Sequence, residues 1–187
     1  LIKASQMESI KRRNKTGNSM PLRLLWVGRL EPIKDPIFMV SLAEELEKRS
    51  FPASICLVGA GSLFREVEEY ISSCDFSKVD VELVGFVSNN EIDKYYLAFD
   101  ALVLTSLTEN LPIVALESRL YNLPIISVPL EFLHDYDGFT DAVIAKQRSV
   151  VSMADEIVNF ANVQIRSANS LNQSIKRQGS ELIKWLS

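Results

Sequence analysis

Two glutamates, Glu109 and Glu117, are the residues best suited to recognise a polar ligand. Seven residues separate them, and within this interval a polar turn is followed by residues with helical spacing. A continuous helix would place them roughly 12 Å and about 80° apart, beside the free backbone amides that attract phosphate at a helix start. Because a carboxylate repels phosphate, we expect each to bind a diol, Glu117 that of a ribose and Glu109 the hydroxyls of a sugar. The alternative is that Glu109 only stabilises the helix dipole and Glu117 is solvated.

A strand, a loop, a helix and a second strand are predicted to position these glutamates. Residues 101–105 and 124–128 form continuous apolar runs, which are typical of strands buried on both faces of a parallel sheet. Between them, helical spacing is kept by Pro112, Ile113, Leu116 and Leu120. We expect the helix to begin within a residue or two of Leu111, with Asn110 as its N-cap and the backbone amides near Asn110 to Pro112 open to an anion.

Two earlier strands are predicted at residues 22–27 and 53–58, and two cations follow the first of them. Gly28 permits close backbone approach at the end of that strand, and Arg29 and Lys34 lie in the short loop after it. A forked guanidinium and a compact ammonium suit a pyrophosphate, which leaves with extra negative charge when a sugar is transferred. The alternative is a pair of ordinary surface charges. Asp35 and Pro36 then predict the cap and the first residue of a helix.

The pair of glutamates belongs to a longer pattern. With Thr-Ser at the end of the strand before it and Leu-Pro-Ile-Ile after it, the pair resembles the E-x7-E signature of retaining GT-B glycosyltransferases of group 1 (family 4). Three upstream stretches resemble successive strand ends of that family in order and spacing: residues 26–35, 57–62 and 84–88. Together the four motifs cover roughly residues 22–145, and the resemblance implies a last strand at residues 142–145.

The resemblance implies a fold and a reaction. The fold is a Rossmann-like, doubly wound α/β domain of about six parallel strands, equivalent to the C-terminal, donor-binding half of a GT-B enzyme. The reaction is transfer of a glycosyl group from a nucleoside-diphosphate sugar with retention of configuration. The resemblance implies catalytic roles for Arg29, Lys34 and Glu109. It also implies donor binding by Gly28, Arg29, Lys34, Phe86, Val87, Glu109, Asn110, Leu111, Pro112 and Glu117, with Val87 near the base.

No cofactor or bound metal is required in this reading. The implied pathway is bacterial surface polysaccharide or lipopolysaccharide synthesis. The acceptor-binding N-terminal half is missing, so we expect weak donor binding and little or no turnover by this chain alone. Two alternatives stay open: a non-catalytic nucleotide-sugar binding module, and another enzyme of the same fold, such as a phosphorylase or an epimerase. The segment Pro129–Tyr136 is bulkier than the small turn that many family members place there.

Composition and length frame the domain. The chain has 187 residues and a net charge of -4, which gives no overall reason to expect nucleic acid. We predict a connector at residues 1–20, with a basic arm for nucleic acid or anionic lipid as the alternative, and a donor-binding domain at residues 21–187 that ends in an amphipathic helical tail. We expect a cytoplasmic protein, with the inner face of the membrane as a setting for the full-length protein and membrane contact outside this domain.

Several other sites are excluded or disfavoured. Phe64 stands where a dinucleotide fingerprint needs its third glycine, so no nicotinamide cofactor is expected. His134 is the only histidine, which argues against a multi-histidine metal centre or a Ser-His-Asp triad. Asp135 and Asp137 spell the Asp-x-Asp metal motif of the GT-A fold, but we expect an ordinary turn there. We also expect reduced thiols at Cys56 and Cys74 and, from the helical patterns, N-caps at Ser62 and Ser152. A further predicted helix carries Tyr95, Tyr96 and Phe99, which we expect to pack in the core.

Overall fold

One parallel sheet organises the protein. The structure, a computed structural model, describes residues 20–164. The sheet has six strands in the order β3-β2-β1-β4-β5-β6, and every neighbouring pair is parallel. The strands are β1 (Leu22–Val27), β2 (Ala53–Val58), β3 (Val79–Gly85), β4 (Ala101–Leu104), β5 (Ile125–Ser127) and β6 (Val143–Ile144). The predicted Rossmann-like α/β fold with about six parallel strands is confirmed.

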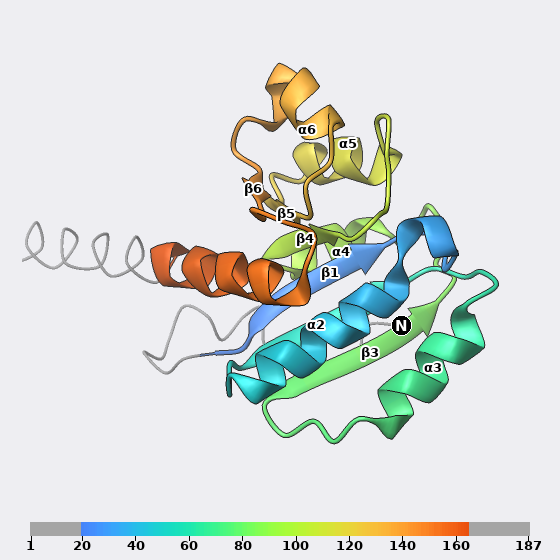
Figure 1. Ribbon diagram of the computed structural model, residues 1–187. Coiled ribbons are helices and arrows are strands. Elements are labelled where there is room, and N and C mark those ends of the chain that lie inside the picture. Colours follow the sequence, from blue (N-terminus) through green and yellow to red (C-terminus); the bar gives the residue numbers. More distant parts are fainter. Residues whose placement is uncertain (1–19, 165–187) are drawn as a thin grey trace, which may run out of the picture.

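Helices cover both faces of this sheet. They are η1 (Pro32–Lys34), α2 (Pro36–Lys48), α3 (Phe64–Ser73), α4 (Asp93–Ala98), α5 (Ile113–Leu120), α6 (Phe132–Asp135), η2 (Asp137–Phe139) and a last helix that the structure describes over residues 150–164. Figure 1 shows α2 and α3 side by side in front of the sheet, with α4 behind it. Right-handed crossovers explain the division, because the chain reverses its direction across the sheet after β3.

The strands form where the sequence is continuously apolar. All four residues of β4 are buried, as are five of the six residues of β2. A strand covered by helices on both faces has no solvated side, so its residues do not alternate between apolar and polar. This is why the predicted bounds 22–27 and 53–58 agree with the observed strands. No helix within residues 20–164 is long and apolar enough to cross a membrane.

The strand order places a crevice at the carboxyl ends of the strands. Strand β1 lies between β2 and β4, and the chain leaves these neighbours toward opposite faces. At such a switch point the loops after the strands separate, and ligands bind at the carboxyl ends of the strands. The loops after β1 and β4 carry the predicted cations and the first glutamate.

The helix that carries Glu117 begins where predicted, but its N-cap and its buried face differ from the prediction. Helix α5 begins at Ile113, its N-cap is Pro112, and no side chain caps it, so Asn110 is not the cap. The large apolar residues whose spacing predicted this helix are exposed in the described structure, with Leu120 at 79%. The smaller residues Ala115 and Ser118 are the buried ones. Helical spacing alone identified the helix but not the face that it buries.

The other predicted helix caps have mixed outcomes. Asp35 caps α2 as expected, because its carboxylate accepts the amide hydrogen of Phe38 at 3.1 Å. Ser62 does not cap α3, because its amide and hydroxyl both donate to the Glu31 carboxylate. The last helix is capped by the Ser149 hydroxyl, which accepts from the amide of Ser152 at 3.2 Å. The predicted Ser152 cap is therefore wrong.

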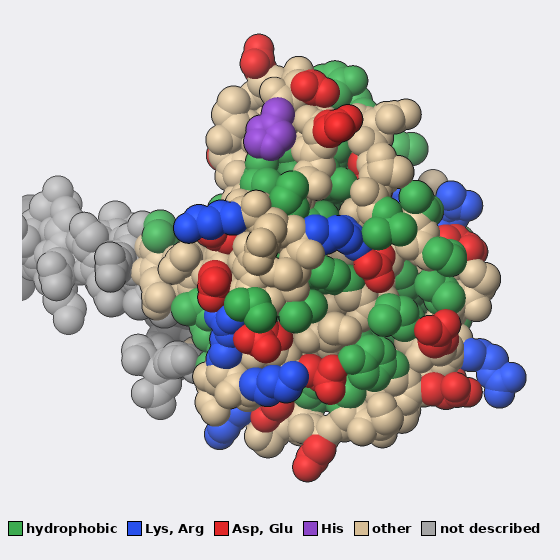
Figure 2. Space-filling view, in the orientation of Figure 1, with side chains coloured by type: hydrophobic (Ala, Val, Ile, Leu, Met, Phe, Trp, Pro, Cys, Tyr) green, Lys and Arg blue, Asp and Glu red, His purple; other side chains and the backbone are tan. Residues whose placement is uncertain are grey.

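The remaining predictions concern loops and chain ends. Strand β6 has two residues, fewer than the predicted 142–145. The atypical segment Pro129–Tyr136 forms the short helix α6. Figure 2 shows Lys and Arg interspersed with Asp and Glu over the face in front of the sheet, without a large patch of one sign. The connector at 1–20 falls almost wholly outside the described residues, as does the helical tail after about residue 167.

Candidate functional site

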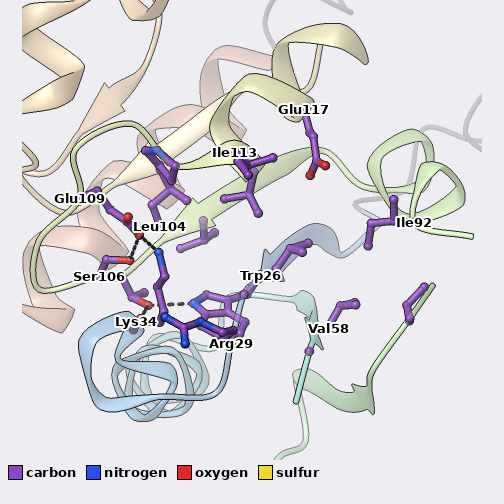
Figure 3. Close-up of a pocket in the computed structure, with 18 of the residues that line it drawn as sticks. Trp26, Arg29, Lys34, Val58, Ile92, Leu104, Ser106, Glu109, Ile113 and Glu117 are labelled. Carbon is purple, nitrogen blue, oxygen red and sulfur yellow. Dashed lines mark hydrogen bonds and ion pairs between the residues drawn. The ribbon is translucent and has the colours of Figure 1, made fainter. Parts of the chain in front are cut away.

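A cleft of about 540 Å³ opens at the carboxyl edge of the sheet (Figure 3). Its walls come from the loops after β1, β2, β3 and β4 and from the start of α5. The cleft brings together almost all of the predicted site residues: Gly28, Arg29, Lys34, Phe86, Val87, Glu109, Leu111, Pro112 and Glu117. Asn110 is exposed and does not line the cleft.

Lys34 and Glu109 form an ion pair within the cleft. The Lys34 ammonium donates to Glu109 Oε1, and the Ser106 hydroxyl donates to the same oxygen at 2.6 Å (Figure 3). The Glu109 side chain is only 10% exposed and that of Lys34 is 23% exposed. An ammonium has three hydrogens to donate, so pairing with Glu109 leaves Lys34 able to bind a second anionic group. Sequence reasoning did not include Ser106 in the site.

A buried threonine joins the two loops that carry this pair. The Thr105 hydroxyl accepts from the indole Nε1 of Trp26 at 2.8 Å and lies 2.9 Å from the carbonyl oxygens of Lys34 and Asp35. The amide of Leu107 also donates to a carbonyl of η1. The end of β4 therefore fixes the backbone of η1, and with it the base of the Lys34 side chain.

Arg148 holds the same region from the other side. Its guanidinium donates to the carbonyl oxygens of Thr105 and Ser106, each at 2.8 Å, and pairs with the Asp35 carboxylate. It also lies 5.1 Å from the ring centroid of Phe38, within range of a cation–π interaction. Asp35 thus uses one oxygen to cap α2 and the other to bind Arg148. The partners are 42 to 113 positions apart in sequence, so no local pattern indicated this cluster.

Glycines let the loops after β1 and β2 meet at the cleft wall. A Cβ atom on Gly59 would lie 1.8 Å from the carbonyl oxygen of Gly28, and Gly59 has a φ of +147°. A Cβ atom on Gly61 would lie 2.4 Å from the carbonyl oxygen of Leu30. The close approach predicted for Gly28 is therefore made possible by the lack of a side chain on Gly59. These glycines shape the loop beside Arg29.

Arg29 and Phe86 stand at the open part of the cleft. Arg29 is exposed, and Phe86 is 79% exposed although it lines the cleft. An exposed aromatic ring beside a cleft is available to pack on a planar ligand. The neighbouring Val87 is half-buried and packs against the core.

The start of α5 offers backbone donors. Ile113 and Val114 line the cleft, and their amides belong to the first turn of the helix, which has no intrahelical acceptors for them. Together with the helix dipole, such amides favour an anion. These amides directly follow those predicted near Asn110 to Pro112, and the helix start at Ile113 is within the predicted two residues of Leu111.

Glu117 projects from α5 into the cleft (Figure 3). Its Oε2 accepts a hydrogen bond of 2.6 Å from the hydroxyl of Tyr96. Tyr96 is 1% exposed, and this burial, followed by the bond to Glu117, raises the pKa of its hydroxyl. Tyr96 was predicted only as a core residue. It is buried in the core, and it also contacts a predicted site residue.

The chemistry available here is that of anion and hydroxyl recognition. Two cations and a helix start can hold phosphate groups, while the two carboxylates can accept hydrogen bonds from hydroxyls. Asp135 lies in α6 and Asp137 in η2. Within residues 20–164 there is no group of three or more His, Cys, Asp or Glu residues that could hold a metal ion.

Comparison with known families adds an independent observation. Residues 8–178 match the family described as "Glycosyl transferases group 1". A relative in Escherichia coli, a UDP-Gal:alpha-D-GlcNAc-diphosphoundecaprenol alpha-1,3-galactosyltransferase, is 30% identical over 135 residues, which cover 63% of this chain and 34% of the relative. The chain spans between a quarter and under a half of the length of the curated relatives it matches.

Solved structures share the fold. The C-terminal domain of a glycosyl transferase group 1 protein (LpcC) from Francisella tularensis has a TM-score of 0.62 and 17% identity, and the match covers 87% of this chain and 84% of that domain. The Anabaena protein Alr3699/HepE, solved in complex with UDP and glucose, has a TM-score of 0.61 and 16% identity over 89% of this chain and 44% of that protein.

Proposed function

Because the chain belongs to the glycosyl transferases of group 1, we propose that it is the donor-binding half of a retaining enzyme that transfers a glycosyl group from a nucleoside-diphosphate sugar. One observation carries the proposal. Arg29, Lys34, Glu109 and Glu117 come from loops and a helix far apart in sequence, and all four line one cleft at the carboxyl edge of the sheet. Binding of a diphosphate and of two sets of hydroxyls needs this combination of charges.

The cations and the helix start are proposed to hold the diphosphate. In glycosyl transfer the bond between the anomeric carbon and the diphosphate oxygen breaks, and the departing diphosphate gains negative charge. Lys34 and Arg29 would stabilise that charge together with the amides of Ile113 and Val114. This support for the leaving group comes from residues of the chain itself, so the proposal includes no bound metal.

The two glutamates are proposed to orient the donor. Glu109 would bind hydroxyls of the donor sugar, and the contacts from Ser106 and Lys34 support this by fixing its carboxylate. Lys34 lies between the glutamate and the proposed diphosphate, so it would also reduce their repulsion. Glu117 would bind the ribose, while Phe86 and Val87 would lie against the base.

The rest of the enzyme is proposed to lie outside this chain. The chain is shorter than its curated relatives, so we propose that an N-terminal half binds the acceptor and that residues 21–187 form the donor domain. The relatives include an amylovoran biosynthesis glycosyltransferase of Erwinia amylovora and the Escherichia coli galactosyltransferase named for a diphosphoundecaprenol-linked sugar. We therefore propose a role in bacterial surface polysaccharide or lipopolysaccharide synthesis, on the cytoplasmic side where nucleotide sugars are made.

Calorimetric titration with UDP, GDP, ADP and dTDP tests the proposal. One nucleotide should bind, and Lys34→Ala should weaken it by about tenfold or more, the equivalent of about 1.4 kcal/mol or the loss of one charge-assisted contact. Lys48→Ala is the matched control, because Lys48 is exposed at the far end of α2 and should leave binding unchanged. Equal weakening by both variants would refute the assignment of Lys34.

Activity of the joined halves separates the remaining functions. A non-catalytic module would bind nucleotide but stay inert when combined with its natural N-terminal half. A phosphorylase would depend on inorganic phosphate as the acceptor. Transfer from the nucleotide sugar without phosphate, with the product anomer matching the donor, is the result we expect.

A further inference from the structure

Among residues 20–164, Tyr96 alone donates a hydrogen bond to the side chain of Glu117. The bond runs from the Tyr96 hydroxyl to Oε2 over 2.6 Å, a length typical of a hydroxyl that donates to a carboxylate. The hydrogen bond from Tyr96 occupies one of the two carboxylate oxygens of Glu117. The other oxygen, Oε1, keeps its full capacity to accept a hydrogen bond from a ligand.

Tyr96 itself is held without freedom to turn away. Its ring is fully buried at 1% exposure and stacks on Tyr121, with centroids 5.3 Å apart and ring planes 3° from parallel. Tyr121 lies at the C-terminal end of α5, and a hydrogen bond with Asp93 at the start of α4 raises the pKa of its hydroxyl. The two rings therefore couple α4 to the helix that carries Glu117.

The protonation of Tyr96 also fixes the direction of the bond. Burial, then the bond to Glu117, raises the pKa of Tyr96 far above its ordinary value. A protonated hydroxyl has one hydrogen to donate and a carboxylate can only accept, so the bond runs from Tyr96 to Glu117. This direction keeps the glutamate as an acceptor.

We propose that Tyr96 is a positioning residue for ribose recognition, because its buried hydroxyl fixes the Glu117 carboxylate so that one oxygen faces the ribose hydroxyls of the donor. This inference rests on the proposed function. It adds a residue that lies outside the cleft lining and that the sequence indicated only as core. Tyr96 would act through Glu117, without contact with the nucleotide.

The test compares nucleotides with and without ribose hydroxyls. UDP, GDP and ADP, each with its 2′,3′-dideoxy form, are titrated into the 187-residue chain and into Tyr96→Phe. Loss of the hydroxyl should free the Glu117 carboxylate and weaken the binding of the ribonucleotide by about threefold to tenfold, the cost of ordering one side chain. Binding of the dideoxy form should change by less than about twofold, because it offers Glu117 no hydroxyl.

Tyr95→Phe is the matched control. Tyr95 directly precedes Tyr96 in α4 and is buried at 4%, but within residues 20–164 its side chain makes no hydrogen bond to a residue of the cleft. It should leave the preference for the ribonucleotide unchanged. Equal weakening of both nucleotide forms in Tyr96→Phe would show a packing role and overturn the proposal, as would no weakening of either.

A second measurement needs no substitution. In the unmodified chain labelled at the tyrosine Cζ carbon, the ribonucleotide should shift the Tyr96 signal, and the dideoxy form should shift it much less. Equal shifts with both forms would overturn the inference even if Tyr96→Phe does not fold. If no nucleotide of any kind binds the unmodified chain, the proposed function itself fails and this inference fails with it.

Discussion

Thr105→Val is the substitution that most sharply tests how the cleft is built. Valine has nearly the shape of threonine but lacks the hydroxyl, and Thr105 is 1% exposed. The change removes the acceptor for the Trp26 indole, which is itself 3% exposed, and the donor to the backbone of η1. No space opens for water to replace either bond. The effect is therefore that of an unpaired buried polar group.

The expected loss is a sizeable part of a domain's stability. An unsatisfied buried donor such as the Trp26 indole costs about 1–3 kcal/mol. Loss of the Thr105 hydroxyl costs less at the carbonyl oxygens of Lys34 and Asp35, because each oxygen keeps a second lone pair. For a chain of this size such a loss lowers Tm by roughly 2–12 °C. The backbone of η1 should also loosen, so Lys34 should be positioned less well and nucleotide binding should weaken by a few-fold.

Urea unfolding followed by far-ultraviolet circular dichroism measures the change in all variants. Thr108→Val is the matched control, because Thr108 is exposed in the same loop and should alter the free energy of unfolding by less than about 0.5 kcal/mol. A Trp26→Phe variant completes a double-mutant cycle in which the two substitutions should cost less together than the sum of each alone. Additive effects, or a Thr105→Val variant as stable as the parent, would refute the reasoning.

Three further predictions follow from the contacts around the cleft. Arg148→Lys should lose most of the stability that Arg148→Ala loses, about 1–2 kcal/mol measured by urea unfolding. The reason is that a lysine ammonium cannot reproduce the forked guanidinium that binds the carbonyls of Thr105 and Ser106. Equal stability of Arg148→Lys and the parent would contradict this. Gly59→Ala should cost at least about 1–3 kcal/mol from its backbone conformation alone, since its Cβ would also overlap the Gly28 carbonyl, and a thermal melt like that of the parent would contradict the loop geometry. Hydrogen bonds to the Glu47 carboxylate, above all the one from Ser77, lower the pKa of Glu47 from 4.5 to about 2. The stability that this carboxylate contributes is therefore complete above pH 4.5 and is lost as pH falls toward 2. Glu47→Gln should flatten the pH dependence of the free energy of unfolding between these values, and an unchanged pH dependence would contradict this prediction.

The fold was readable from the sequence because buried parallel strands leave a simple pattern. Continuous apolar runs predicted β1 and β2 with their observed bounds, and the Asp35-Pro36 pair marked the start of α2. The N-cap and the buried face of α5 could not be predicted in the same way. Its N-cap has no side-chain hydrogen bond, and its larger apolar residues are exposed in the structure, so neither capping nor periodicity identified them.

The site was partly readable for a related reason. Arg29, Lys34 and Glu109 lie in loops that follow strands, and a parallel sheet brings the carboxyl ends of its strands to one side. No local sequence pattern identifies the residues that hold these charged side chains in place. Thr105 contacts Trp26 from 79 positions away, and Tyr96 reaches Glu117 from 21 positions away. These pairings depend on the order of the strands and on the packing of the helices, and the sequence alone does not predict where individual side chains lie in that packing.

Mapping of the nucleotide on the backbone amides tests the central claim most directly. In the nitrogen-15 amide spectrum of the 187-residue chain, UDP, GDP, ADP and dTDP would each be titrated to saturation. The account predicts that one of them shifts the amides of residues 28–34, 86–89 and 109–114, which surround the cleft. Shifts confined to α2 and α3 on the face in front of the sheet, or no shifts with any of the four nucleotides, would contradict it.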